Sequence, residues 1–141
     1  MKIKYIEHER TQDAPFIGAL IVASDCNRDC KGCFNQHLKQ LPNIDVTVNE
    51  IISEVKHNPF NEGVILGGLE WMEQISDMMD LISAAKINNL EVMLQTGHDV
   101  YPNIPQMYVK YGRYRDEFKT HDNIQYGVKL ASSNQNIIYR Q

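Results

Sequence analysis

The sequence predicts a single α/β domain over residues 1–141, folded as a compact, incomplete (open) α/β barrel. Three observations support this prediction. Apolar runs rich in β-branched residues alternate with helical patterns, which is typical of parallel βαβ units. These runs are too few to close an eight-stranded barrel. The 141 residues suit one domain, and no linker, repeat or low-complexity segment divides them.

The first elements are predicted to be strands. Ile3 and Tyr5 alternate with lysines, which indicates a short edge strand near the N-terminus. Residues 16–24, FIGALIVAS, form a continuous apolar run, as expected of a strand buried on both faces. This run leads directly into the segment that holds all the cysteines. We therefore expect the cysteines at the carboxyl end of the strand, where sites lie in parallel α/β folds.

Three helices are predicted from the spacing of apolar residues and from capping and breaking signals. A short helix over residues 35–40 precedes Pro42, and Thr47 with Glu50 forms a capping-box pattern that predicts a helix over residues 48–57. A longer helix is expected after residue 70, where apolar residues recur at helical spacing up to Asn88 and Asn89. Its apolar positions are Trp71, Met72, Ile75, Met78, Met79, Ile82 and Ala85.

The remaining strands follow the same alternation. Residues 63–67, GVILG, and 91–95, EVMLQ, are short apolar runs that predict buried strands. Residues 106–111 alternate as a fourth strand, and residues 137–139 add a terminal strand. Residues 100–105 form a loop marked by prolines, and residues 112–123 are polar and aromatic.

The three cysteines of the chain, Cys26, Cys30 and Cys33, lie four and then three positions apart. A structural zinc site needs four ligands, so zinc would require His37 or another residue as the fourth. One disulfide with a spare thiol is a second interpretation, which needs an oxidising compartment. A [4Fe-4S] cluster explains an odd count best, because three thiolates leave one iron without a protein ligand.

Two separate motifs resemble a known family. The pattern CxxxCxxC resembles the radical S-adenosylmethionine (SAM) enzymes, and the string CKGCFN resembles the activating proteins of anaerobic ribonucleotide reductases. Residues 131–135, ASSNQ, are similar to the SSNQ segment near the C-terminus of those activases. The resemblance extends over nearly the whole chain and implies an open α/β barrel of the radical SAM type.

The resemblance also implies an activity. In the family, the open iron of the cluster binds the amino and carboxylate groups of SAM, and reductive cleavage gives a 5′-deoxyadenosyl radical. The resemblance implies that this radical removes a hydrogen atom from a glycine of the large subunit of an anaerobic ribonucleotide reductase. It further implies a reducing electron donor such as flavodoxin.

Several residues match the family's SAM-binding positions. Gly67 and Gly68 follow the second buried strand and resemble the glycine motif beside the methionine moiety, although alone they would indicate a tight turn. The motif departs from the usual form, because Leu69 precedes Glu70 and Trp71 occupies the usual place of proline. Glu70 is expected to receive the amino group or to favour the first turn of the helix.

Further candidates flank these positions. Thr96 resembles the activase Thr-Gly step, with a polar turn as the alternative. Lys110 is placed to meet the cofactor carboxylate, although an exposed lysine on an edge strand is a slightly favoured alternative. Gly32 would contact adenine through its backbone, and Phe34 would anchor the loop. Asn35 would bond near the cluster or cap the following helix.

The composition excludes other classes. The net charge is −4 and no basic stripe exists, so nucleic acid is not expected as a partner. No apolar run is long enough for a membrane helix, and the charged N-terminus predicts a cytoplasmic protein.

Three functions are alternatives to the reductase activase. The first is a compact radical SAM enzyme acting on a small molecule, such as a deazapurine synthase. The others are a pyruvate formate-lyase-type activase and a non-catalytic iron–sulfur or zinc module. His98 is the histidine nearest the expected site.

Overall fold

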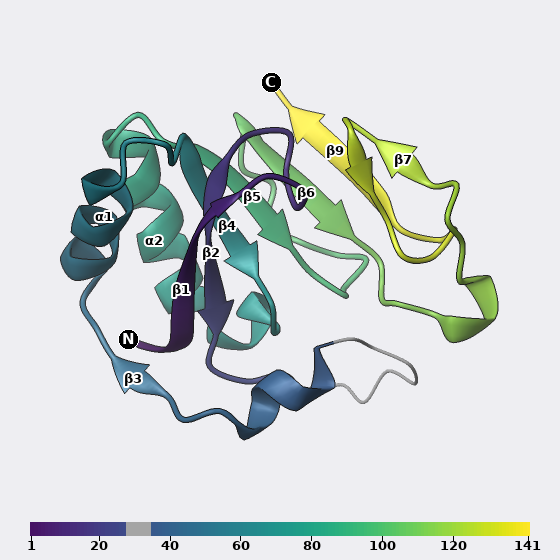
Figure 1. Cartoon of the computed structure of the whole chain (residues 1–141), viewed down its shortest axis with the longest axis horizontal. Helices are drawn as coiled ribbons and strands as arrows, with labels where there is room; N and C mark the ends of the chain where they lie inside the picture. The colour runs from purple at the N-terminus through teal and green to yellow at the C-terminus, as the bar shows by residue number, and fades with distance from the viewer. Residues whose placement is uncertain (28–34) are drawn as a thin grey trace.

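The protein is built on one seven-stranded sheet, with a separate two-stranded hairpin near the C-terminus (Figure 1). A computed structural model describes residues 1–27 and 35–141. The sheet has the strand order β3-β1-β2-β4-β5-β6-β9. Its strands are β1 (Lys2–Arg10), β2 (Gly18–Ala23), β3 (Ile44–Asp45), β4 (Gly63–Gly67), β5 (Glu91–Gln95), β6 (Met107–Tyr111) and β9 (Asn136–Arg140).

The centre of the sheet is parallel and its borders are antiparallel. Strands β2, β4, β5 and β6 run in the same direction, whereas β1 and β3 on one side and β9 on the other run antiparallel to their neighbours. All six residues of β2 and all five of β4 are buried, as predicted. The N-terminal strand extends to Arg10, well beyond the short edge strand predicted, because it pairs with β2 and β3.

Helix α1 (Val48–His57) has the predicted bounds. Thr47 Oγ1 accepts a hydrogen bond from the Glu50 amide at 3.1 Å, and Glu50 Oε1 accepts one from the Thr47 amide at 3.2 Å. This reciprocal capping box satisfies two amides that the first turn leaves without helical partners. A short 3₁₀ helix, η1 (Gln36–Gln40), occupies the place of the first predicted helix.

The longer helix predicted after residue 70 is divided. A 3₁₀ turn, η2 (Trp71–Gln74), precedes α2 (Ile75–Ile87), and Ile75 is exposed rather than part of the apolar face. Gln74 lies at this break, and its side-chain oxygen accepts hydrogen bonds from the amide and hydroxyl of Ser24. These contacts to the end of β2 favour a backbone at Gln74 that a continuous helix does not permit.

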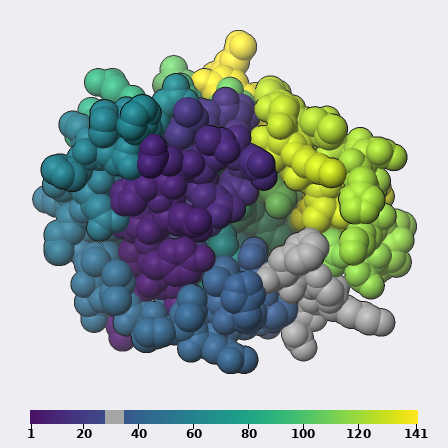
Figure 2. Space-filling view, viewed as in Figure 1, coloured from purple at the N-terminus to yellow at the C-terminus, as the bar shows by residue number. Residues whose placement is uncertain are grey.

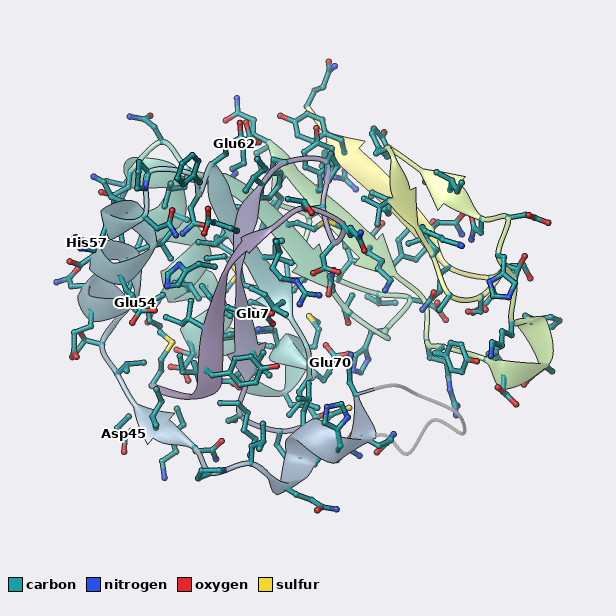
Figure 3. All side chains as sticks on the ribbon, in the orientation of Figure 1. Glu7, Asp45, Glu54, His57, Glu62 and Glu70 are labelled. Atoms are coloured by element: carbon teal, nitrogen blue, oxygen red, sulfur yellow. The ribbon has the colours of Figure 1, made fainter. Side chains whose placement is uncertain are left out.

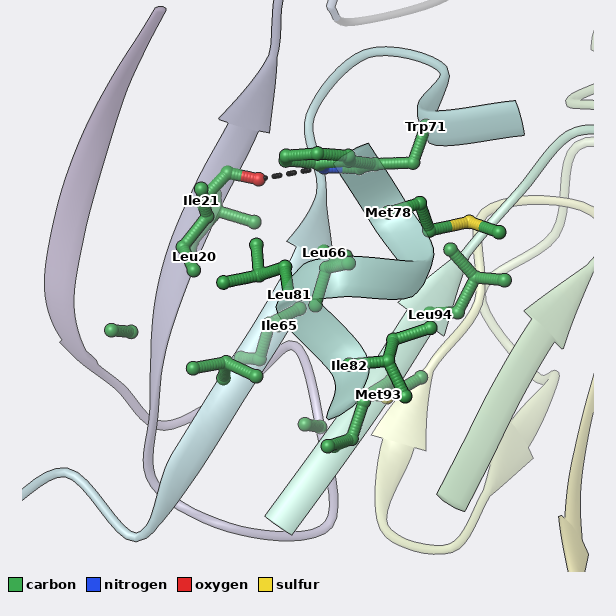
Figure 4. Packing of buried hydrophobic residues seen from close by; sticks show 14 of the residues in the cluster. Leu20, Ile21, Ile65, Leu66, Trp71, Met78, Leu81, Ile82, Met93 and Leu94 are labelled. Carbon is green, nitrogen blue, oxygen red and sulfur yellow. Dashed lines mark hydrogen bonds between the residues drawn. The ribbon is translucent and has the colours of Figure 1, made fainter. Parts of the chain in front are cut away.

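The core lies between the sheet and the two helices, which cover the same side of the sheet (Figures 1 and 4). Met78, Leu81 and Ile82 of α2 pack with buried residues of β4 and β5. Trp71 is fully buried, and its indole nitrogen donates a hydrogen bond to the Ile21 carbonyl at 3.0 Å. Met78 is fully buried and fills the core, as its apolar helical spacing predicted.

A loop of residues 11–17 crosses the other side of the sheet. Phe16 packs against Tyr108 with ring centroids 6.2 Å apart. The side-chain nitrogen of Gln95, Nε2, donates a hydrogen bond to the Asp13 carbonyl at 3.1 Å. Arg10 Nε donates to the Asp13 carboxylate at 2.5 Å. This hydrogen bond and the charge of Asp13 raise the pKa of the Arg10 guanidinium above its usual value, against a smaller effect of burial. The loop therefore covers part of the helix-free face.

The C-terminal region contains structure that the sequence did not predict. A short 3₁₀ turn, η3 (Asp116–Phe118), precedes the hairpin of β7 (Ile124–Gln125) and β8 (Val128–Lys129). Both turn residues have positive φ, 50° at Tyr126 and 77° at Gly127, as in the tight turns that suit the strand twist of hairpins.

The α/β class is confirmed, and the sheet is open, with β3 and β9 at its ends. The finer prediction of an incomplete barrel stays a prediction. Neither α1 nor α2, the α-helices of the described residues, is long and apolar enough to cross a membrane.

Candidate functional site

A cavity of about 160 Å³ lies at the carboxyl ends of the four parallel strands. Its walls come from the segments that follow β2, β4, β5 and β6, together with η1 and the residues before β9. Figure 2 shows the surface hollowed between the N-terminal part of the chain and the C-terminal segment. The carboxyl edge of the parallel strands is thus where the sequence placed the site.

Cys26 forms part of the cavity wall and is half-buried. The segment around it is anchored at both sides. The Asp25 carbonyl accepts a hydrogen bond from the Glu70 amide at 3.0 Å, and the Asn27 amide donates to the Glu73 carboxylate at 2.8 Å. The cysteine segment therefore begins from a point that is fixed to η2 and to the turn after β4.

Four predicted site residues lie outside the described part of the chain. These are Cys30, Gly32, Cys33 and Phe34. Their predicted roles as cluster ligands, adenine contact and loop anchor stay predictions.

The predicted glycine turn lies where expected, and its two glycines have different roles. Gly67 ends β4 and is covered by Gln95, whose side chain occupies the space that a Cβ would need. Gly68 lines the cavity with φ of 78°, and a Cβ there would lie 2.7 Å from Val22 Cγ1. Both positions require glycine for packing, and Gly68 requires it for its backbone conformation as well.

Glu70 lines the cavity but is 4% exposed, and its carboxylate binds three donors of the chain (Figure 3 labels Glu70). Oε1 accepts from the Gly97 amide at 2.8 Å. Oε2 accepts from Thr96 Oγ1 at 2.9 Å and from the Met72 amide at 3.1 Å. The alternative role in the first turn of the helix is thus confirmed for η2. The carboxylate also joins the ends of β4 and β5.

Thr96 is buried in the cavity wall, and its side chain does more than form a polar turn. Its hydroxyl donates to Glu70 and accepts a hydrogen bond from the His98 amide at 3.0 Å. His98 itself is not among the residues that line the cavity. Asn35 lines the cavity at the start of η1, and its side chain makes no capping hydrogen bond. The capping interpretation of Asn35 is therefore wrong.

Lys110 lines the cavity from an interior strand. Strand β6 pairs with β5 on one side and with β9 on the other, so the alternative of a lysine on an edge strand is wrong. Lys39 of η1 and Arg113 beyond β6 also line the cavity. Three cationic side chains thus surround a cavity with one acidic side chain, Glu70, among its described lining residues, and this charge balance favours a ligand with an anionic group.

Part of the SSNQ segment lines the cavity, and part of it supports the cavity wall. Gln135 lines the cavity and is 4% exposed, and its Oε1 accepts from the amides of Ala131 and Ser132. Its Nε2 donates to the Gly112 carbonyl at 3.3 Å, which ties the segment to the end of β6. The motif therefore shapes one cavity wall through a turn held by its own glutamine.

Sequence reasoning missed several cavity residues. These are Gln36, Lys39, Leu69, Gln95, Gly112, Arg113 and Tyr114. Gln95 carried a weak signal, because it is the polar end of an apolar run on a strand that leads to the site. For Arg113 and Tyr114 no local signal existed, since their place depends on the folding of residues 112–135 around the cavity.

The described residues fit an iron–sulfur cluster held at the cavity. A thiol on the wall begins a segment in which the other two cysteines follow within seven positions, which matches the three-thiolate ligand set. The anchored backbone at Asp25 and Asn27 fixes where that segment starts. The cationic wall also suits the anionic charge of a cluster bound by thiolates.

Comparisons with known proteins agree with this fit. Comparison with curated proteins gives no match. A family model described as a 4Fe-4S single cluster domain matches residues 17–138, which is most of the chain and includes all three cysteines. The chain therefore belongs to the 4Fe-4S single cluster domain family.

Proposed function

We propose that this protein is a radical SAM enzyme that generates a glycyl radical on the large subunit of an anaerobic ribonucleotide reductase. The observation that carries the proposal is the cavity at the ends of the parallel strands, with Cys26 and Gly68 on its wall. The CKGCFN and SSNQ strings support the activase branch. The open sheet is compatible with the incomplete barrel that the proposal implies.

The cluster and SAM together would supply one-electron cleavage of a carbon–sulfur bond and the radical that removes a glycine hydrogen. The chain's residues would bind and orient. Cys26, Cys30 and Cys33 would hold the cluster, and Gly68 would allow close backbone approach to the ligand. Lys110 would stabilise a carboxylate, and Glu70 would keep the turn after β4 fixed against Thr96.

The cavity favours catalysis over the alternatives. An iron–sulfur domain that only carries electrons is compatible with the family match, but it needs no cavity beside a cysteine. A large protein substrate would present a flexible loop at the cavity mouth. The proposal includes a cytoplasmic location, with a donor such as flavodoxin reducing the cluster. Small-molecule radical SAM activity, as in deazapurine synthases, is the second candidate, since the cationic wall also suits an anionic substrate.

The test is anaerobic reconstitution with iron and sulfide, reduction in the presence of SAM, and mass-spectrometric detection of 5′-deoxyadenosine. We expect 5′-deoxyadenosine from the wild-type protein and none from Cys26→Ala or Cys30→Ala. Addition of the reductase should then give the electron paramagnetic resonance signal of a glycyl radical. A fully clustered protein that forms no 5′-deoxyadenosine with the reductase present would leave the electron-carrying module as the function.

The cysteine variants also test the ligand assignment. Cys30→Ala should abolish cluster assembly while largely preserving the fold. Iron content and far-ultraviolet circular dichroism measure these two properties separately. Full cluster occupancy in Cys30→Ala would contradict the assignment.

A further inference from the structure

The side chain of Gln95 presents an unused acceptor to the cavity. Gln95 is the last residue of β5 and lines the cavity. Its side-chain nitrogen, Nε2, donates a hydrogen bond to the Asp13 carbonyl at 3.1 Å. A backbone carbonyl only accepts hydrogen bonds, so the nitrogen must face Asp13 and Oε1 must face away from it. Among the described residues, none donates a hydrogen bond to Gln95 Oε1.

The position of Oε1 is set by Gly67. A Cβ at Gly67 would overlap Oε1, so the oxygen lies directly over the end of β4. On the other side, the Asp13 carbonyl belongs to the loop that Arg10 holds through the Asp13 carboxylate. The amide of Gln95 is therefore oriented from both sides before any ligand binds, and such preorganisation lowers the cost of binding.

Glu70 differs from Gln95 in this respect. Its two carboxylate oxygens already accept from Met72, Thr96 and Gly97. A ligand amino group would have to share these oxygens with donors of the chain. Gln95 Oε1 carries no such load, so it is the better-placed acceptor on this wall.

Lys110 lies beside Gln95. The two residues are register partners on β5 and β6, and the same strand alternation puts their side chains on the helix-free face. Both side chains line the same cavity. A hydrogen-bond acceptor and a cation on neighbouring strands of one cavity match the amino group and the carboxylate of an α-amino acid.

We infer that Gln95 Oε1 accepts a hydrogen bond from the amino group of an α-amino-acid moiety whose carboxylate lies toward Lys110. The inference rests on the proposed function, in which that moiety is the methionine end of SAM. It assigns to Gln95 the role that the sequence assigned to Glu70. Gly67 then has a specific purpose, because any side chain there would displace the acceptor.

The test measures binding to the cluster-reconstituted protein by anaerobic calorimetry with two probes. S-adenosylhomocysteine carries the amino-acid moiety, and methylthioadenosine lacks it. Gln95→Met keeps the length of the side chain and removes the acceptor. We expect it to weaken S-adenosylhomocysteine binding by about 10- to 100-fold, the cost of one hydrogen bond to a charged or polarised group, and to leave methylthioadenosine unchanged.

Two further variants sharpen the test. Gly67→Ala should cause the same selective loss, because its Cβ takes the place of Oε1 while Gln95 is retained. Gln40→Met makes the same chemical change at an exposed position at the end of η1, outside the cavity, and should alter neither affinity.

The outcomes separate this inference from the proposed function. Equal losses for both probes in Gln95→Met would mean that Gln95 only supports the loop of residues 11–17, and would overturn the inference. Unchanged S-adenosylhomocysteine binding would overturn it as well. Both results would leave the proposed function standing, whereas a wild-type protein that binds neither probe would overturn both.

Discussion

Glu70 shows how one side chain can carry a structural load inside a functional site. It is almost fully buried, and its carboxylate joins the turn after β4 to the end of β5 through Thr96 and Gly97. Removing a buried acceptor leaves its donors without partners, which costs more than the net value of the hydrogen bonds. The residue therefore matters to the fold even in the absence of any ligand.

We predict that Glu70→Ala lowers the free energy of unfolding of the cluster-free protein by about 3 kcal/mol, because three donors lose their acceptor. Urea denaturation followed by circular dichroism measures the change. Glu117→Ala is the control, since Glu117 is exposed and its ion pair with Arg115, at 3.5 Å, contributes little. Equal stability of wild type and Glu70→Ala would contradict this structural role of Glu70.

At the scale of elements, the turn from β4 to η2 is the part of the cavity wall most restricted by packing. Gly68 has φ of 78° and faces the side chain of Val22 on β2. Gly127 in the turn between β7 and β8 has nearly the same φ, 77°, with nothing within 4 Å of its Cβ position. The two glycines therefore separate the cost of backbone conformation from the cost of a steric clash.

We predict that Gly127→Ala destabilises the protein by about 1 kcal/mol, the cost of a left-handed backbone for alanine. Gly68→Ala should cost a further ~1–3 kcal/mol, because its Cβ overpacks against Val22. Urea denaturation of both variants checks the difference. Equal effects would show that the turn after β4 moves away from β2 at little cost.

At the scale of the whole molecule, an aromatic cluster joins segments that are distant in the sequence. Tyr108 on β6 packs against Phe16, Tyr126 and Tyr139, with ring centroids 6.2, 5.5 and 4.6 Å apart. It thereby connects the loop of residues 11–17, the β7–β8 hairpin and β9. Burial raises the pKa of Tyr108 above its usual value, and the charge of Glu91 raises it further.

This pKa shift predicts how stability depends on pH. The folded protein holds the Tyr108 proton more tightly than the unfolded chain, so the contribution is complete below about pH 10 and is lost as pH rises through the folded pKa. Urea denaturation from pH 9 to about pH 11 should therefore show falling stability, with a smaller fall in Tyr108→Phe. Tyr101, whose pKa burial also raises, would account for part of the residual slope. An unchanged slope in Tyr108→Phe would contradict the prediction.

The sequence alone determined features that depend on near neighbours. The capping box of Thr47 and Glu50 sets the start of α1 within one turn, so its bounds were predictable. The buried runs of β2 and β4 are continuous apolar stretches, so their burial was predictable too. The cysteine spacing indicated an iron–sulfur cluster, and the family match supports that cofactor.

Tertiary structure alone decided the features that depend on strand order and side-chain neighbours. Lys110 became interior because β9, distant in the sequence, pairs beside β6. Glu70 holds the turn after β4, and Gln95 is an oriented acceptor, because β4 and β5 end side by side next to the loop that contains Asp13. Local patterns specify which elements form, because their contacts span a few residues. Which polar groups meet at the cavity depends on long-range packing, which periodicity does not encode.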